Sequence, residues 1–178
     1  MTDDASTLGI DPCVDNDPMV VAHAQALLAD GSRVAAIRGD VRHPEDVICH
    51  DEVQRLIDFS RPVAVLLAAV LHQVADVDGP VGVVAQFMDT VAPGSHLVLS
   101  HPTHDRLPAD AGVTRKLYER AGMSLVTRSK DEIGALFAGL ELVAPGLVFT
   151  VEWRPHQQIE DPGLAGIYAG VARKPHAG

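Results

Sequence analysis

The stretch RPVAVLLAAVLH, from Arg61 to His72, contains the longest apolar run of the chain, Val63 to Leu71. Continuous apolar sequence is typical of a strand that helices cover on both faces, whereas a half-exposed strand alternates apolar and polar residues. The run is far shorter than the ~20 residues that a membrane-spanning helix needs. We therefore expect residues 63–71 to form a buried strand at the centre of the core.

The chain before this strand alternates between helix and strand signals. Asp17 has the side chain that accepts hydrogen bonds from free N–H groups at a helix start, and Gly31 stops the helix that begins there. An apolar stretch over residues 33–37 predicts a strand. Apolar residues at roughly helical spacing over residues 45–59 predict two helical pieces or one broken helix.

The same alternation continues after the apolar run. A helix is expected from Ser129 to Phe137, because Ser129 and Glu132 have the spacing of a capping box. The other expected elements are helices over 81–91 and 113–121 and extended segments over 95–100, 140–147 and 166–173. Alternating strands and helices with short connections predict an α/β fold, with a mostly parallel sheet and helices on both faces.

Ligands of such sheets bind beyond the carboxyl ends of the strands, at an edge that we call the rim. The loops expected to line it are residues 14–17, 39–42, 71–76 and 100–104. A carboxylate at the position of Asp15 is able to accept two hydrogen bonds from ribose hydroxyls, although Asp-Asn-Asp-Pro is also a common loop and helix cap. Asp40, in the next loop, is either solvated or positioned to accept from an adenine amino group.

Three stretches carry a family resemblance: RPVAVLLAAVLH (61–72), APGSHLVLSH (92–101) and FAGLELVAPGL (137–147). In this order and spacing they resemble the later strands of class I S-adenosylmethionine-dependent methyltransferases. Together with VDNDP (14–18) and YAGVARKP (168–175), they resemble more closely an actinobacterial family of S-adenosyl methyltransferases, mostly of unknown substrate. The resemblance covers nearly all of the chain from Val14 onward and implies a Rossmann-like methyltransferase sheet.

The resemblance also implies a cofactor, S-adenosyl-L-methionine, and roles for six residues. Asp15, with Asn16 beside it, would hold the cofactor ribose. Asp40 would meet the adenine edge with Val41 packing nearby, and Ala69 would lie beside the methionine portion. His72 falls where many relatives have a Leu-His pair that faces the reaction centre; it would orient the substrate or take a proton, or else be a hydrogen-bonded rim histidine.

The chain departs from the family at its beginning, where the usual first strand and Gly-rich turn are lacking. Only TLGIDPC (7–13) precedes Val14, and Pro12 cannot donate a hydrogen bond within a central strand. We expect one domain, 1–178, with an irregular segment over 1–13. A true start of the gene upstream is one explanation for the lacking strand. Without the first strand, two buried sheet edges would keep unpaired backbone groups, which lower stability. We therefore expect weak or no cofactor binding and little activity from this chain.

Composition bounds the partners. A formal charge of −10, from 14 Lys and Arg against 24 Asp and Glu, argues against nucleic acid. The N-terminus lacks the features of a secretory signal, so we expect a cytoplasmic protein without membrane association. Cys13 and Cys49 are isolated and expected to be reduced. The His101, His104 and Asp105 group is not expected to bind metal, and a homo-oligomer is one way to cover a sheet edge.

Three functional hypotheses remain open at this point. The first is a methyltransferase that uses S-adenosylmethionine on an unknown, small-molecule acceptor, contacted by residues 101–111 and 154–163. The second is a catalytically inactive remnant of the fold that serves as a binding or interaction module, which the missing Gly-rich turn favours. A nicotinamide-dependent oxidoreductase comes last, because the G-x-G-x-x-G turn that it needs does not occur in the chain.

Overall fold

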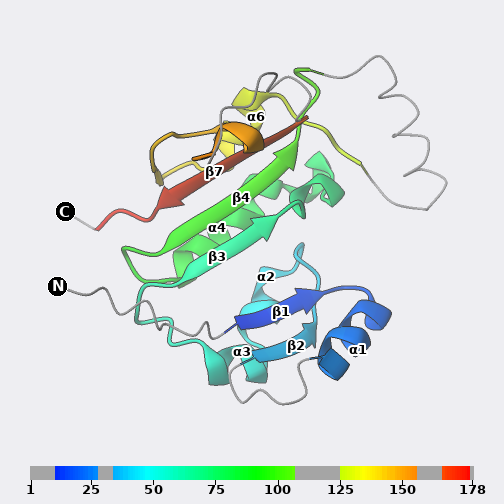
Figure 1. Cartoon of the computed structure of the whole chain (residues 1–178). Helices are drawn as coiled ribbons and strands as arrows, with labels where there is room; N and C mark the ends of the chain where they lie inside the picture. The colour runs from blue at the N-terminus through cyan, green and yellow to red at the C-terminus, as the bar shows by residue number, and fades with distance from the viewer. Residues whose placement is uncertain (1–10, 28–33, 107–124, 156–165, 177–178) are drawn as a thin grey trace. The chain divides into compact units, whose positions relative to one another are not determined.

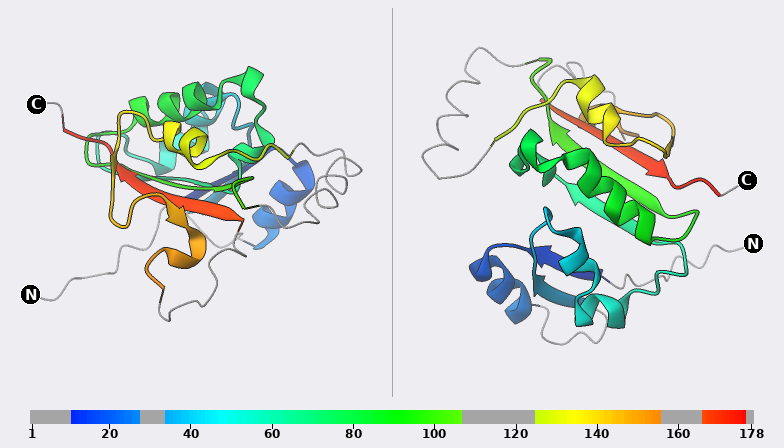
Figure 2. Two further views of the ribbon diagram at one scale, coloured as in Figure 1. Left: turned by 90° about the horizontal axis from the view of Figure 1, so that it is seen from above. Right: turned by 180° about the vertical axis from the view of Figure 1, so that it is seen from behind.

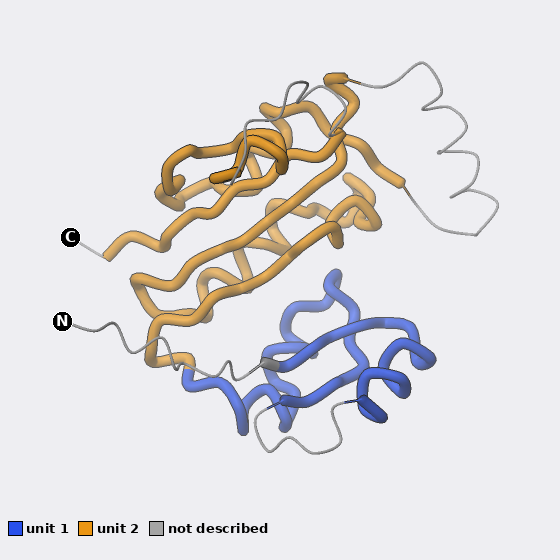
Figure 3. Tube along the Cα trace, in the orientation of Figure 1, with its two compact units in different colours: residues 1–58 blue, residues 59–178 orange. Residues whose placement is uncertain are grey.

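The computed structural model describes residues 11–27, 34–106, 125–155 and 166–176. The chain divides into two compact units, Met1–Asp58 and Phe59–Gly178, which Figure 3 colours separately. The helix predicted over residues 113–121 lies outside the described residues. The single domain expected over residues 1–178 stays a prediction. In the described part of the chain, no helix is both long enough and apolar enough to cross a membrane.

Unit 1 is built on two parallel strands, β1 (Asp11–Asp15) and β2 (Val34–Arg38). Its helices are α1 (Pro18–Leu27), α2 (Pro44–Ile48) and α3 (Asp51–Leu56) (Figure 1). Figure 2 shows α1 on one side of the strand pair and α2 and α3 on the other. The predicted first helix, the strand after it and the break within residues 45–59 are confirmed.

Local hydrogen bonds explain where these helices begin. The Asp17 carboxylate accepts a bond of 2.8 Å from the backbone N–H of Met19, which caps α1. The break between α2 and α3 lies at His50, whose Nδ1 accepts from the backbone N–H of Glu52 at 3.1 Å. Gly39 ends β2 where space is tight, because a Cβ atom there would lie 2.8 Å from a Val14 methyl carbon.

The start of unit 1 differs from the sequence prediction. Residues 1–13 were expected to be irregular, but β1 begins at Asp11, and Pro12 pairs with Ala35 in the parallel register. Among the described residues β1 has a single strand neighbour, β2. A strand with one open edge accommodates proline, because the missing N–H matters only on the side that faces a partner.

Unit 2 contains a five-stranded sheet in the order β3-β4-β7-β5, with β6 also paired to β7. β3 and β4 are parallel, and the pairings of β7 with β4, β5 and β6 are antiparallel. The strands are β3 (Ala64–Ala68), β4 (His96–Pro102), β5 (Glu141–Leu142), β6 (Val148–Phe149) and β7 (Ile167–Arg173). The other elements are η1 (Leu71–Gln73), η2 (Asp76–Asp78), α4 (Pro80–Thr90), α6 (Lys130–Ala135) and η3 (Thr150–Glu152).

The core of unit 2 lies between one sheet face and two helices. Side chains alternate along β4, so that Leu97, Leu99 and His101 are fully buried on one face. Figure 2 shows α4 and α6 on one side of the sheet and the β6–η3 segment on the other. α6 begins at the predicted capping box, in which Ser129 and Glu132 bond to each other's backbone N–H. The α/β fold class is confirmed.

The predicted burial of the strand at residues 63–71 is wrong. β3 is the terminal strand of its sheet among the described residues, and only Leu67, at 6% exposure, is buried in it. Leu66 on the opposite face is 63% exposed. A continuous apolar run predicts burial on both faces, but the helices of unit 2 cover one.

Candidate functional site

The carboxyl end of β1 presents Asp15, which is half-buried. Its Oδ1 accepts a hydrogen bond of 2.8 Å from the backbone N–H of Asp17, which orients the carboxylate within the turn that leads into α1. Its backbone carbonyl accepts from Gly39 N at 3.0 Å, which holds the end of β1 against the end of β2. A carboxylate oriented in this way is able to accept from hydroxyl donors of a ligand.

The loop after β2 presents Asp40, whose carboxylate is held by its neighbour Arg42. The guanidinium donates to both carboxylate oxygens, with Nη2 to Oδ2 at 2.5 Å, and the Arg42 N–H donates to Oδ1 at 2.9 Å. These hydrogen bonds from Arg42 lower the pKa of Asp40 below its usual range, so that Asp40 is ionised at neutral pH. A ligand amino group that donates to Asp40 would therefore compete with Arg42 for the carboxylate oxygens or share them with it.

Four of the six predicted site residues lie together in unit 1. Because β1 and β2 are parallel and Asp15 pairs with Arg38 in their register, the segments that follow them leave the same edge. Asp15 and exposed Asn16 lie at the end of one strand, and Asp40 and half-buried Val41 follow the other. The remaining two, Ala69 and His72, belong to unit 2.

Ala69 follows β3 directly and has a backbone φ of 51°. Its N–H donates to both the carbonyl oxygen and the hydroxyl of Ser100 in β4, at 3.2 and 3.0 Å. A left-handed conformation is unfavourable for a residue with a Cβ atom. Strained backbone of this kind concentrates at functional sites, which agrees with the position expected for Ala69.

We expect Ala69→Gly to leave the stability of the protein unchanged or to raise it by up to about 1 kcal/mol. Relief of the left-handed strain, about 1–2 kcal/mol, offsets the greater entropy of glycine in the unfolded chain. Ala68→Gly, one residue earlier and within β3, is the control and should lower the free energy of unfolding by about 0.5–1 kcal/mol. Urea denaturation measures both, and equal destabilisation by the two changes would contradict the strain.

His72 lies in the 3₁₀ turn η1, just beyond Ala69, and is 7% exposed. Its backbone carbonyl accepts from Val126 N at 2.8 Å. Burial lowers the pKa of His72, so that the imidazole is neutral at pH 7. A neutral imidazole is able to accept a proton, which is the chemistry expected of this residue from the sequence.

Sequence reasoning missed Arg128, which is 4% exposed and adjoins the His72 turn. Its Nη1 donates to the Leu71 carbonyl at 3.1 Å, and its Nη2 donates to the Val74 carbonyl at 2.9 Å and to Asp76 at 2.6 Å. Its Nη1 also lies 2.7 Å from His101 Nε2. These partners are distant from Arg128 in sequence, so no local signal was available to find it.

The two histidines of residues 101–105, His101 and His104, have separate surroundings. His101 is fully buried, and His104 is exposed with its Nδ1 at 3.0 Å from the Thr127 carbonyl. The pKa of His101 is lowered, chiefly by burial and further by the charge of Arg128. No group of three side chains suited to holding a metal occurs in the described ranges.

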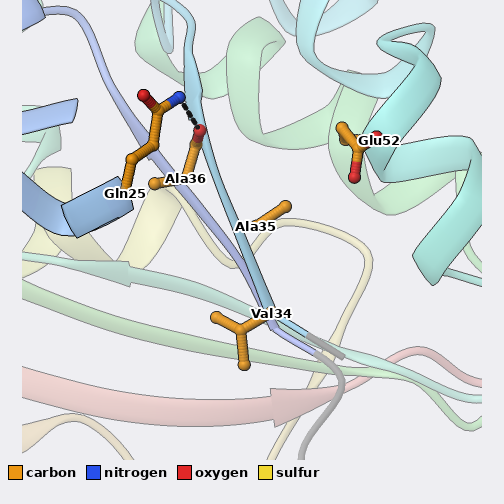
Figure 4. A pocket seen from close by; sticks show the side chains of 5 residues that line it. All are labelled: Gln25, Val34, Ala35, Ala36 and Glu52. Atoms are coloured by element: carbon orange, nitrogen blue, oxygen red, sulfur yellow. Dashed lines mark hydrogen bonds between the residues drawn. The ribbon is translucent and has the colours of Figure 1, made fainter. Parts of the chain in front are cut away.

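A hollow of about 220 Å³ lies within unit 1. Figure 4 shows the residues that line it, Gln25, Val34, Ala35, Ala36 and Glu52, with the Gln25 amide donating to the Ala36 carbonyl at 2.9 Å. None of the residues predicted from the sequence lines this hollow, so it adds nothing to the candidate site.

Comparison with known protein families gives one match over nearly the whole chain. The S-adenosyl methyltransferase family matches residues 12–175. A comparison with curated proteins gave no significant match.

Two solved structures from actinomycetes are similar in both sequence and fold. A candidate methyltransferase from Thermobifida fusca is 38% identical, with a TM-score of 0.84 over 93% of this chain and 63% of that one. A DUF574-family protein from Streptomyces avermitilis is 33% identical, with a TM-score of 0.85 over 92% of this chain and 64% of that one. The present chain thus spans just under two thirds of the length of these relatives.

A more distant structure shares the fold alone. The N-methyltransferase NodS from Bradyrhizobium japonicum, solved with S-adenosyl-L-homocysteine, is 17% identical with a TM-score of 0.54, over 93% of this chain and 66% of that one.

Proposed function

The chain belongs to the S-adenosyl methyltransferase family, and on this premise we propose that it binds S-adenosyl-L-methionine and transfers the methyl group to a small-molecule acceptor. The observation that carries the proposal is the placement of Asp15 and Asp40 at the adjacent carboxyl ends of two parallel strands. That edge is where ligands of open α/β sheets bind.

The residues of unit 1 fit the nucleoside part of this cofactor. The Asp15 carboxylate is oriented by the hydrogen bond to its Oδ1, and its remaining acceptor capacity suits ribose hydroxyls. Gly39 lies where a Cβ would meet the Val14 side chain, so the chain comes close together there. Asp40, with Val41 beside it, would accept from the adenine amino group.

The residues of unit 2 fit the reaction itself. When bound, the cofactor would supply a methyl group attached to a sulfonium sulfur. The acceptor would displace the sulfur from the methyl carbon directly, and the sulfur would keep the electron pair of the broken bond. Ala69 would lie beside the methionine portion. His72, neutral because burial lowers its pKa, would take the proton that an acceptor O–H or N–H loses as its new bond to the methyl carbon forms. Positioning and exclusion of water supply the rest.

The acceptor is proposed to be a small molecule, with no nucleic acid or membrane partner. The acidic balance of the chain gives a phosphate backbone no counter-surface. Asp105 and Arg106 lie in the first of the two segments expected to contact the acceptor, and their exposed charged side chains are candidates for that contact. A second copy of the chain covering an exposed sheet edge stays a prediction, as does the cytoplasmic location.

A non-catalytic binding module is the second candidate function, and one observation favours it. Among the described strands, β1 pairs with β2 alone within unit 1, and β3 pairs with β4 alone within unit 2. Sheet edges that lack a partner weaken a cofactor site that depends on rigid strand ends. Binding of the cofactor without turnover would favour this function over methyl transfer.

Turnover is tested by incubating the purified chain with S-adenosyl-L-methionine and a panel of small hydroxyl and amino compounds, and measuring S-adenosyl-L-homocysteine. We expect slow product formation with at least one acceptor class. His72→Asn should lower kcat by about 10²–10⁴-fold, because asparagine cannot take the proton. His96→Asn at the amino end of β4 is the matched control and should leave kcat unchanged. Unchanged turnover in His72→Asn would make His72 a structural rim residue.

A further inference from the structure

One buried side chain, that of Arg128, holds the 3₁₀ turn that contains His72 by hydrogen bonds to its backbone. η1 spans Leu71–Gln73, and Arg128 donates to the carbonyls at both sides of His72, those of Leu71 and Val74, at 3.1 and 2.9 Å. A single guanidinium thus bridges the two ends of the turn. The planar fork of arginine makes several such bonds at fixed geometry, which the ammonium of lysine cannot do.

Arg128 is itself fixed from two further directions. Its Nη2 bonds at 2.6 Å to the carboxylate of Asp76, the residue that opens η2. The backbone N–H of Arg128 donates to the Pro102 carbonyl at 3.2 Å, and Arg128 forms an isolated parallel β-bridge with Thr103, just after the end of β4. Arg128 is therefore held to β4 by its main chain and to the turn by its guanidinium.

The contact with His101 requires one protonation state. His101 Nδ1 lies 2.8 Å from the Pro102 carbonyl, which only accepts, so Nδ1 carries the proton. Its Nε2 faces Arg128 Nη1 at 2.7 Å, and because a guanidinium only donates, Nε2 must be the acceptor. The ring of His101 in turn meets that of His72 edge-on, with 6.4 Å between the centroids.

From this geometry we infer that Arg128 is a positioning residue for His72. It acts through the turn Leu71–Val74 and through the neutral His101, and touches neither cofactor nor acceptor. The inference rests on the proposed function where it concerns turnover. Its structural part, that Arg128 sets the environment of the His72 ring, stands without it.

The test is Arg128→Lys, which keeps the charge but loses the fork, with Arg173→Lys as the matched control. Arg173 pairs with Glu141 on the surface at 2.8 Å, both being about half exposed, so its replacement should change nothing. In the wild type, ¹⁵N spectra at pH 7.5 should show His101 as the Nδ1–H tautomer. In Arg128→Lys that signature should be lost and the His72 ring resonances should shift.

In turnover, Arg128→Lys should lower kcat on the order of 10²-fold, as expected for a misplaced catalytic group, while the KM for S-adenosyl-L-methionine stays within about threefold. Changes of His72 resonances equal to those of Arg173→Lys would overturn the inference, whether or not the protein is active. A rise in the KM for S-adenosyl-L-methionine with an unchanged kcat in Arg128→Lys would also overturn it. A wild type without turnover would instead count against the proposed function, and the spectra would still decide the role of Arg128.

Discussion

Replacement of Leu99 by alanine is expected to lower the free energy of unfolding by about 2–5 kcal/mol, which is a large part of the stability of an ordinary domain. Leu99 is fully buried in β4, in which buried and half-buried side chains alternate. Its removal deletes buried methyl groups and leaves a cavity in a rigid strand that cannot collapse around it.

Leu66→Ala is the matched control for this change. Leu66 lies in the neighbouring strand β3 but on the opposite face and is 63% exposed, so its truncation should change stability by no more than about 0.5 kcal/mol. Urea denaturation followed by circular dichroism measures both variants. A loss for Leu66→Ala as large as that for Leu99→Ala would mean that the second face of β3 is covered in solution.

Asp15→Asn is expected to weaken S-adenosyl-L-methionine binding by about 10- to 100-fold. A hydrogen bond to a charged group contributes about 1.5–3 kcal/mol, and the amide has one acceptor oxygen where the carboxylate has two. The asparagine oxygen still accepts from the Asp17 N–H, so the turn before α1 is retained and the loss is attributable to the ligand contact.

Equilibrium dialysis with labelled cofactor measures this change. Asp46→Asn, which removes an exposed carboxylate from the first turn of α2, is the control for charge and should bind like the wild type. Equal binding by Asp15→Asn and the wild type would remove Asp15 from the cofactor site.

Local signals in the sequence predicted local structure well. Ser129 and Glu132 predicted the start of α6, since a capping box needs only residues three apart. Asp17 predicted the start of α1 for a similar reason. These interactions are complete within one turn of chain, so the sequence contains all the information that they require.

Properties that depend on distant residues were not predictable. The exposure of Leu66 depends on which elements cover β3, and an apolar run says nothing of that. The partners of Arg128 lie 52 to 57 residues before it at Leu71, Val74 and Asp76, so an isolated arginine in a polar stretch gave no sign of its burial. The ion pair of Asp40 with Arg42 is local, but a lone Asp in a loop did not distinguish it from a solvated carboxylate.

The site was predictable in part for a topological reason. Parallel strands place their carboxyl ends at one edge, so the order of strands and loops along the chain is enough to predict that Asp15 and Asp40 are neighbours. The register of β1 and β2 brings their loops together in this way. The cofactor-binding and catalytic roles of all six predicted residues stay predictions; they are Asp15, Asn16, Asp40, Val41, Ala69 and His72.

Binding of S-adenosyl-L-methionine at the carboxyl ends of β1 and β2 underlies the proposed function, and calorimetric titration of the folded wild-type chain tests this binding most directly. We predict saturable binding of one cofactor per chain, with an affinity weaker than micromolar. A folded chain that gives no saturable heat at millimolar cofactor would contradict it.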